Sequence, residues 1–258
     1  MAWDSGSAYE VFMGRWSRQI ASIFVAALGA DPGLRWLDVG CGTGALTQAI
    51  VDLAGPITVD GVDASPGFLE EARRSELGPA TFHIASGDEL PFPSSTFDFV
   101  VSGLALNFMP DPARALLEWA RVARPGGRVA VYVWDYAGRM GFLRQFWDTV
   151  AGLDPIGARE DQAERFSICR PDVLASAFVA AGLSDVDVSS IEISTHFTSF
   201  DDYWQPFLAG VGPAGAYTTG LTVAEQARLA SALEDALPFG EDGSIDLPAR
   251  AWTAGGTV

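Results

Sequence analysis

The stretch that decides the fold is RWLDVGCGTGAL, which runs from Arg35 to Leu46. An apolar run ends at Gly40, and glycines then stand at alternate positions 40, 42 and 44. Glycine allows a sharp backbone turn and lets a ligand approach with no side chain in the way. Apolar residues at helical spacing follow within residues 45–54. This order predicts a strand, a glycine loop and a helix whose first amides face a ligand.

Strands and helices alternate on both sides of this loop. Seven apolar runs predict strands, at residues 34–40, 57–63, 81–88, 97–103, 128–135, 186–194 and 244–252. Six segments with helical spacing predict helices, at residues 17–29, 45–54, 65–74, 111–124, 170–182 and 222–237. In the helix at 111–124 we expect Asp111 as N-cap and a buried stripe of Ala113, Leu116, Leu117 and Ala120.

The alternation predicts an α/β fold with a doubly wound, mostly parallel seven-stranded sheet. A chain of 258 residues is long enough for one good core, so we expect a single domain over residues 1–258. Within it we expect an N-terminal helical cap at 1–30, a cofactor-binding core at 33–135, and completing strands at 136–258. The aromatic-rich segment FDDYWQPFLAG (200–210) has no clear period, and a substrate-side insertion before the last strand is predicted at about 199–243.

Composition excludes several classes of function. The net charge is −17, which repels nucleic acids and acidic membranes, so we expect neither as a partner. All 16 basic residues are arginine, so there is no lysine for a Schiff base or a P-loop. Two cysteines and two histidines do not form a metal-binding spacing, and no metal is expected. Lacking an apolar run of membrane length and a signal sequence, the protein is predicted to be cytoplasmic.

The glycine loop alone leaves two ligands open. Its spacing, Gly40-x-Gly42-x-x-Ala45, also fits the dinucleotide fingerprint, and a carboxylate such as Asp63 accepts ribose hydroxyls from any adenosine ligand. Asp38 counts against a dinucleotide, because dinucleotide sites usually have only apolar residues at this position of the strand. Asp88, just past the third strand, can accept from an adenine amino group, although a simple turn residue is the alternative.

Five segments occur in a characteristic order: WLDVGCGTG (36–44), VDAS (62–65), SGDELPFP (86–93), FDFVVSGLALNFMPDP (97–112) and RVARPGGRVAV (121–131). Together they resemble the class I S-adenosylmethionine-dependent methyltransferases. The closest type is that of ubiquinone and menaquinone biosynthesis and its small-molecule relatives. The resemblance covers about residues 33–135. It implies a Rossmann-like methyltransferase fold whose loop holds the methionyl end of S-adenosylmethionine, which carries no phosphate.

The resemblance also implies a cofactor site drawn from each segment. The loop would pass along the amino-acid portion, Asp63 would bind the ribose, and Gly87 with Asp88 would close the adenine pocket. The residues expected to bind the cofactor are Tyr9, Arg15, Trp16, Asp38, Gly40, Cys41, Gly42, Asp63, Ala64, Phe68, Gly87, Asp88, Glu89, Ser102, Gly103 and Leu104. For the N-terminal three, an ordinary helix entry is the alternative.

The acceptor is expected to be a hydrophobic or aromatic small molecule. Aromatic and amide side chains at or after the strand ends suit such a pocket, with core packing as the alternative for each. The candidates are Asn107, Phe108, Trp134, Tyr136, Tyr203, Trp204 and Phe207. Methyl transfer from a sulfonium needs orientation more than a nucleophile, so no catalytic residue is assigned. His196 is the candidate for a general base, with a strand histidine held by its neighbours as the alternative.

Two other functions remain open at this point. One is an NAD(P)-dependent oxidoreductase, against which Asp38, Asp88 and the missing Tyr-x-x-x-Lys pair count. The other is a protein that binds S-adenosylmethionine without transferring its methyl group, since the binding segments would look the same. The sequence predicts no oligomeric state.

Overall fold

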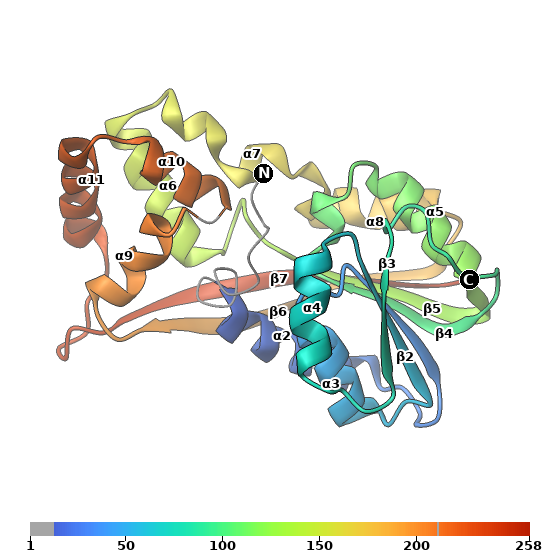
Figure 1. Cartoon of the computed structure of the whole chain (residues 1–258). Helices are drawn as coiled ribbons and strands as arrows, with labels where there is room; N and C mark the ends of the chain where they lie inside the picture. The colour runs from blue at the N-terminus through green and yellow to red at the C-terminus, as the bar shows by residue number, and fades with distance from the viewer. Residues whose placement is uncertain (1–12, 211) are drawn as a thin grey trace. The chain divides into compact units, whose positions relative to one another are not determined.

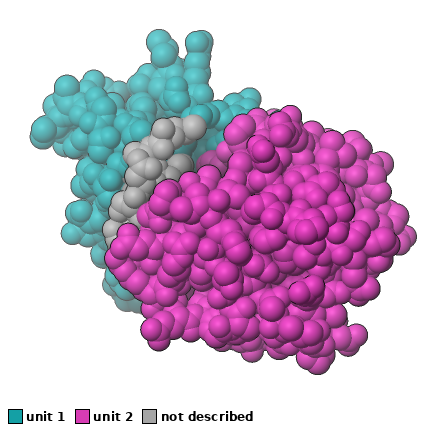
Figure 2. Space-filling model, turned by 45° about the vertical axis from the view of Figure 1, so that its right-hand side comes forward, with its two compact units in different colours: residues 1–13, 134–167, 192–250 teal, residues 14–133, 168–191, 251–258 magenta. Residues whose placement is uncertain are grey.

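The structure is a computed structural model that describes residues 13–210 and 212–258. The chain divides into two compact units, which Figure 2 colours separately. Unit 1 comprises residues 1–13, 134–167 and 192–250, and unit 2 comprises residues 14–133, 168–191 and 251–258. The domain boundaries expected from the sequence, including the cap at 1–30, stay a prediction.

Seven strands form one sheet in the order β3-β2-β1-β4-β5-β7-β6 (Figure 1). Their bounds are β1 Arg35–Val39, β2 Thr58–Asp63, β3 Ala80–Ile84, β4 Phe97–Gly103, β5 Ala123–Trp134, β6 Ser184–Phe197 and β7 Ile245–Thr257. Neighbours among β1 to β5 pair in parallel. β7 runs antiparallel to β5, because Gly127 bonds to Val258 at one end while Asp135 bonds to Arg250 at the other. The predicted mostly parallel seven-stranded sheet is confirmed.

The strand order reverses at β1, which pairs with β2 on one side and β4 on the other. In doubly wound sheets, ligands bind at the carboxyl ends of the strands beside such a reversal. The glycine loop follows β1 there, and the short 3-10 helix η2 (Leu106–Phe108) follows β4. This reversal therefore positions the candidate site within unit 2.

Helices cover both faces of the unit 2 strands. They are α2 Arg15–Leu28, α3 Ala45–Ala54, α4 Pro66–Arg74, α5 Pro112–Val122 and α8 Pro171–Ala180. α2 packs on α3, and α5 packs on α8, with the two pairs on opposite sides of the strands in Figure 1. Asp111 caps α5 through the backbone N–H of Arg114, as predicted.

Of the four residues predicted for the buried stripe of α5, Leu116 is buried and Ala120 is half-buried, but the prediction is wrong for the other two. Ala113 and Leu117 are exposed, and the buried residues of α5 are Ala115, Leu116, Trp119 and Val122. The reason is Trp119, whose indole Nε1–H donates to the carbonyl of Gly87 at 2.8 Å. Trp119 has the largest side chain on α5 and is fully buried. The buried face of the helix is therefore the face that carries Trp119.

Unit 1 is built around helices that the sequence pattern only partly predicts. They are α6 Gly141–Leu153, α7 Gln162–Arg165, α9 Phe200–Leu208, α10 Gly212–Gly220 and α11 Val223–Ala236. α11 begins with a capping box of Thr222 and Glu225. The segment without a clear period forms α9, and its Phe207 stacks on Phe146 of α6 with ring centroids 4.4 Å apart. Across the described ranges, no helix combines the length and apolar character needed to cross a membrane.

Candidate functional site

The glycine loop joins β1 to α3 through left-handed backbone. Gly40, Gly42 and Gly44 have φ of 73°, 54° and 92°, which disfavours other residues. Gly40 is constrained twice, because a side chain there would also overlap Ala105, which follows β4. The backbone N–H groups of Gly40 and Cys41 donate to the carbonyl of Val62 at 2.8 and 3.0 Å. The loop is thus fixed against β2 and lies close to the chain that leaves β4.

Asp63 ties the loop to the end of β2. Its Oδ2 accepts from the backbone N–H of Gly42 at 2.9 Å, and its Oδ1 accepts from that of Ser65 at 2.8 Å. Burial raises the pKa of this carboxyl, while the two N–H bonds oppose that rise. A carboxylate has about four acceptor positions, so Asp63 can still accept from a hydroxyl group of a ligand. Ala64 and Phe68 lie beside it at the start of α4, exposed and half-buried respectively.

Asp38 lies in β1 with no exposed surface. Its Oδ2 accepts a hydrogen bond from Thr47 Oγ1 at 2.7 Å, and its Oδ1 has no hydrogen-bond partner. Burial raises the pKa of Asp38 from 3.8 to about 7, and the nearby Asp63 carboxylate adds to the rise. Burial, with Asp38 and Asp63 next, also raises the pKa of the Cys41 thiol. Cys41 is therefore a protonated, poorly nucleophilic thiol.

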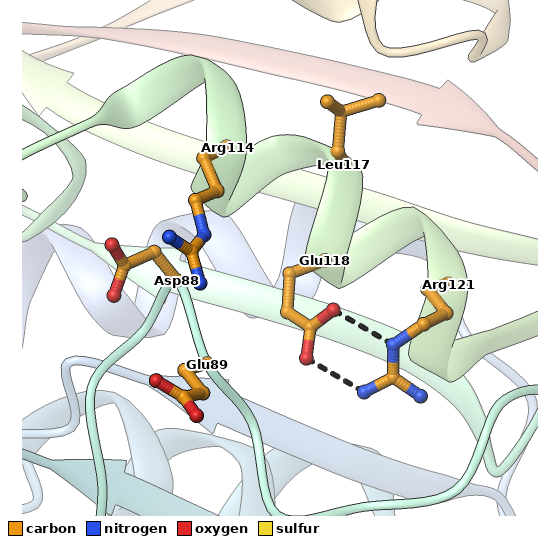
Figure 3. A pocket seen from close by; sticks show the side chains of 6 residues that line it. All are labelled: Asp88, Glu89, Arg114, Leu117, Glu118 and Arg121. Carbon is orange, nitrogen blue, oxygen red and sulfur yellow. Dashed lines mark hydrogen bonds and ion pairs between the residues drawn. The ribbon is translucent and has the colours of Figure 1, made fainter.

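Gly87, Asp88 and Glu89 lie in the turn after β3. The carbonyl of Gly87 is held by Trp119, and Ser86 Oγ hydrogen-bonds to the Asp88 carboxylate. This turn borders a cavity of about 410 Å³ between itself and α5 (Figure 3). The cavity is lined by Asp88, Glu89, Arg114, Leu117, Glu118 and Arg121.

The α5 side of this cavity carries an internal ion pair. Arg121 binds both Glu118 oxygens, at 2.6 and 2.7 Å, and this bond holds the pKa of Glu118 below its usual value. Arg114 and Glu118 point from α5 toward the Asp88–Glu89 turn in Figure 3, and Leu117 points away from it. The sequence prediction found the two acids of the turn and missed the residues of α5.

The end of β4 gathers buried polar atoms without partners. Ser102 Oγ and both amide atoms of Asn107 are buried and unbonded. Leu104 between them has φ of 59°, a left-handed backbone that costs a non-glycine residue on the order of 1 kcal/mol. The space beside Gly103 is filled by Tyr132 of β5. Unpaired buried polar groups and strained backbone are typical of a binding site rather than of a core.

The candidates in unit 1 lie in a packed interior. Tyr203 is fully buried and donates to the carbonyl of Phe142 at 2.9 Å, and Phe207 is fully buried as well. Trp134, Tyr136 and Trp204 are also buried. These five aromatics are thus buried, with the indole Nε1 of Trp134 lacking a hydrogen-bond partner, and a role toward an acceptor stays a prediction.

The remaining candidates stand apart from these groups. His196 is 54% exposed, with Nδ1 3.2 Å from Asp246 Oδ1. The Arg15 guanidinium lies 4.5 Å from the ring centroid of Trp16. Tyr9 lies outside the described residues. Thr47 and Trp119 were missed by the sequence prediction because neither belongs to a glycine or acid pattern. No group of metal-binding side chains occurs in the described part of the chain.

The part of the chain that contains this site is similar to a known protein family. Residues 37–131 match the family described as "Methyltransferase domain". These residues are therefore similar to methyltransferase domains. The match contains the glycine loop, Asp63, the Asp88 turn and Asn107. It confirms the resemblance to the class I methyltransferases.

Curated relatives match part of the chain. The demethylmenaquinone methyltransferase of Bacillus licheniformis is 36% identical over 123 residues, 46% of this chain and 53% of that protein. The chloroplastic 2-methyl-6-phytyl-1,4-hydroquinone methyltransferase 2 of rice is 44% identical over 95 residues, 36% of this chain and 27% of that protein. The chain thus spans about half the length, or less, of these relatives.

A solved structure extends the likeness to the whole fold. Phosphoethanolamine N-methyltransferase 2 of Haemonchus contortus, in complex with S-adenosylmethionine, matches with a TM-score of 0.60 and 17% identity. The match covers 98% of this chain and 56% of that protein. At this identity the likeness shows the fold, which is the predicted Rossmann-like methyltransferase fold.

Proposed function

We propose that this protein transfers the methyl group of S-adenosylmethionine to a small-molecule acceptor. The observation that carries the proposal is the joined glycine loop and Asp63, at the sheet's point of reversal and within the matched residues 37–131. The geometry fits this cofactor. Glycines leave room beside the backbone, and Asp63 can still accept from a ribose hydroxyl. When bound, the cofactor supplies an electrophilic methyl group on a positively charged sulfur.

The residues of the chain position the reactants. Gly40, Cys41 and Gly42 would border the amino-acid portion, and Asp63 the ribose. Gly87 and Asp88 would border the adenine. Because charge disperses during methyl transfer, orientation and exclusion of water are the main contributions of the protein. His196 is more than half exposed and forms an ion-pair geometry with Asp246, so we assign it no proton transfer.

A hydrophobic or aromatic acceptor is part of the proposal. Two relatives are named for a demethylmenaquinone and for a phytyl hydroquinone. In this chain, Phe108 is 41% exposed immediately after the unbonded amide of Asn107. An aromatic surface next to an amide with free donor and acceptor atoms suits an aromatic ring that carries oxygen substituents.

Calorimetric titration tests the cofactor. We expect S-adenosylhomocysteine to bind at micromolar concentration and NAD and NADP not to bind. Asp63→Ala should weaken S-adenosylhomocysteine binding by about 1–3 kcal/mol, roughly tenfold to a hundredfold, because hydrogen bonds to a charged group are lost. Asp60→Ala is the matched control: this carboxylate also lies on β2, but it binds His83 at 2.7 Å and not the loop.

Two results would contradict the assignments. Binding of a dinucleotide instead would indicate the oxidoreductase alternative, and unchanged affinity of Asp63→Ala would remove the ribose assignment. Methyl transfer itself is tested with a labelled methyl donor and a panel of quinols and phenols. Cofactor binding without labelled product across that panel would favour a binding protein that does not transfer methyl.

A further inference from the structure

Asp38 combines complete burial with an incomplete set of hydrogen bonds. Only Thr47 donates to its carboxyl group, at Oδ2, and Oδ1 is buried without a partner. An ionised carboxylate in such a place lacks the donors or the cation that would replace its water shell. The group is therefore better suited to the neutral form until a donor arrives at Oδ1.

The charged groups that face Asp38 add no positive charge. From the end of β2 comes the carboxylate of Asp63, which disfavours a second negative charge, and from the loop comes the protonated Cys41 thiol. From α3 come the hydroxyl and the backbone N–H of Thr47, which are both neutral. Arg73 of α4 acts on the Cys41 thiol, yet no ion pair reaches Asp38 within the described ranges. The site is short of one positive charge.

Resting on the proposed function, we propose that the ammonium group of the cofactor takes the place of a proton on Asp38, so that cofactor binding ionises this residue. The O–H bond of Asp38 breaks, its proton leaves to solvent, and the ammonium keeps its own three protons. The positive charge of the proton on Asp38 is thus replaced by the positive charge of the ammonium group. Oδ1 gains a donor, and the repulsion between Asp38 and Asp63 is offset.

The linkage predicts how binding depends on pH. Free Asp38, with a pKa of about 7, is neutral at pH 6 and ionised at pH 8. Because binding at low pH first requires deprotonation, affinity for S-adenosylhomocysteine should fall roughly tenfold from pH 8 to pH 6. The number of protons released should rise from near zero at pH 8.5 to about one half at pH 7 and about one at pH 6.

The test is calorimetry of the full chain in pairs of buffers that differ in ionisation enthalpy, which counts protons released on binding. S-adenosylhomocysteine carries the ammonium, and 5′-methylthioadenosine carries the same nucleoside and thioether without it. We expect proton release with the first ligand and none with the second. Asp38→Asn should abolish the release. Thr47→Val should move its midpoint to higher pH, because a hydrogen bond that favours the ionised form is lost.

Asp63→Asn is the matched control, since both of its oxygens already have backbone donors, and it should bind more weakly yet still release a proton. Equal proton counts for the two ligands, or release that persists in Asp38→Asn, would overturn the inference while leaving the proposed function intact. If neither ligand binds, the proposed function itself fails. Should Asp38→Asn not fold, the comparison of the two ligands on the natural protein decides alone.

Discussion

Asp38 also links the stability of the ligand-free protein to pH. Burial raises its pKa from 3.8 to about 7, so the folded state holds a proton that the unfolded state releases between these values. The folded state therefore loses stability as pH rises through this window, by about 4 kcal/mol in total. Above pH 7 the carboxyl is ionised in both states and the loss is complete.

Asp38→Asn should remove this dependence, because an amide does not ionise. Measured by urea unfolding, the free energy of unfolding of the variant minus that of the natural protein should increase by about 3 kcal/mol between pH 5 and pH 8. Comparing the two proteins cancels the titration of the other carboxylates. A difference that stays constant with pH would mean that Asp38 is solvated in the folded state.

Single residues of the site were predictable where backbone geometry selects the residue type. Gly40 needs a left-handed φ and has Ala105 against it, and Asp63 ends the strand β2 beside the loop. Thr47 and Trp119 were not predictable, because their roles depend on which way a helix is turned. Spacing along the chain places a residue at a strand end, but it does not say which side chain it meets.

At the scale of elements, α5 illustrates this limit. Leu116 and Leu117 are both compatible with a helical apolar period, so the pattern alone includes both in the buried stripe. In the structure Leu116 is fully buried, whereas Leu117 is 55% exposed at the rim of the cavity. The hydrogen bond from Trp119 to Gly87 fixes how α5 is rotated about its axis. This long-range contact cannot be predicted from the local sequence pattern.

The pair offers a matched test of that orientation. Leu116→Ala should lower the free energy of unfolding by about 2–5 kcal/mol, because it leaves a cavity in a packed core. Leu117→Ala should change it by no more than about 0.5 kcal/mol, because its side chain is already in contact with water. Chemical denaturation of both variants measures the two values. Equal losses of stability in the two variants would mean that Leu117 is buried as Leu116 is, as the helical period predicts.

For the whole molecule, the sheet was the most predictable feature. Parallel strands buried on both faces are continuous apolar runs, and helical segments separate those runs within residues 34–135 except between the third and fourth strands. Unit 1 was less predictable: Tyr203 and Phe207 stand four residues apart on α9 and their rings pack together, yet the short aromatic segment was not predicted as a helix. The aromatics predicted for an acceptor pocket are buried there, and their role toward an acceptor stays a prediction.

Net charge is a property of the whole molecule with a consequence for stability. With −17 charges at neutral pH, the folded chain repels itself more than the expanded unfolded chain does. Exposed ion pairs such as Arg74–Glu70, whose side chains are 63% and 71% exposed, offset little of this repulsion. Salt screens charges over about 10 Å at 0.1 M, so it should weaken the repulsion.

The thermal unfolding midpoint at pH 7.5 should therefore rise when NaCl is increased from 10 to 300 mM. Relief of about 1 kcal/mol would correspond to about 2–4 °C for a chain of this size. The control is the same pair of salt concentrations near the isoelectric point of about 4.3, where net repulsion is absent and the rise should vanish. A midpoint that falls with salt at pH 7.5 would mean that local pairs, such as Arg121 with Glu118, outweigh the net charge.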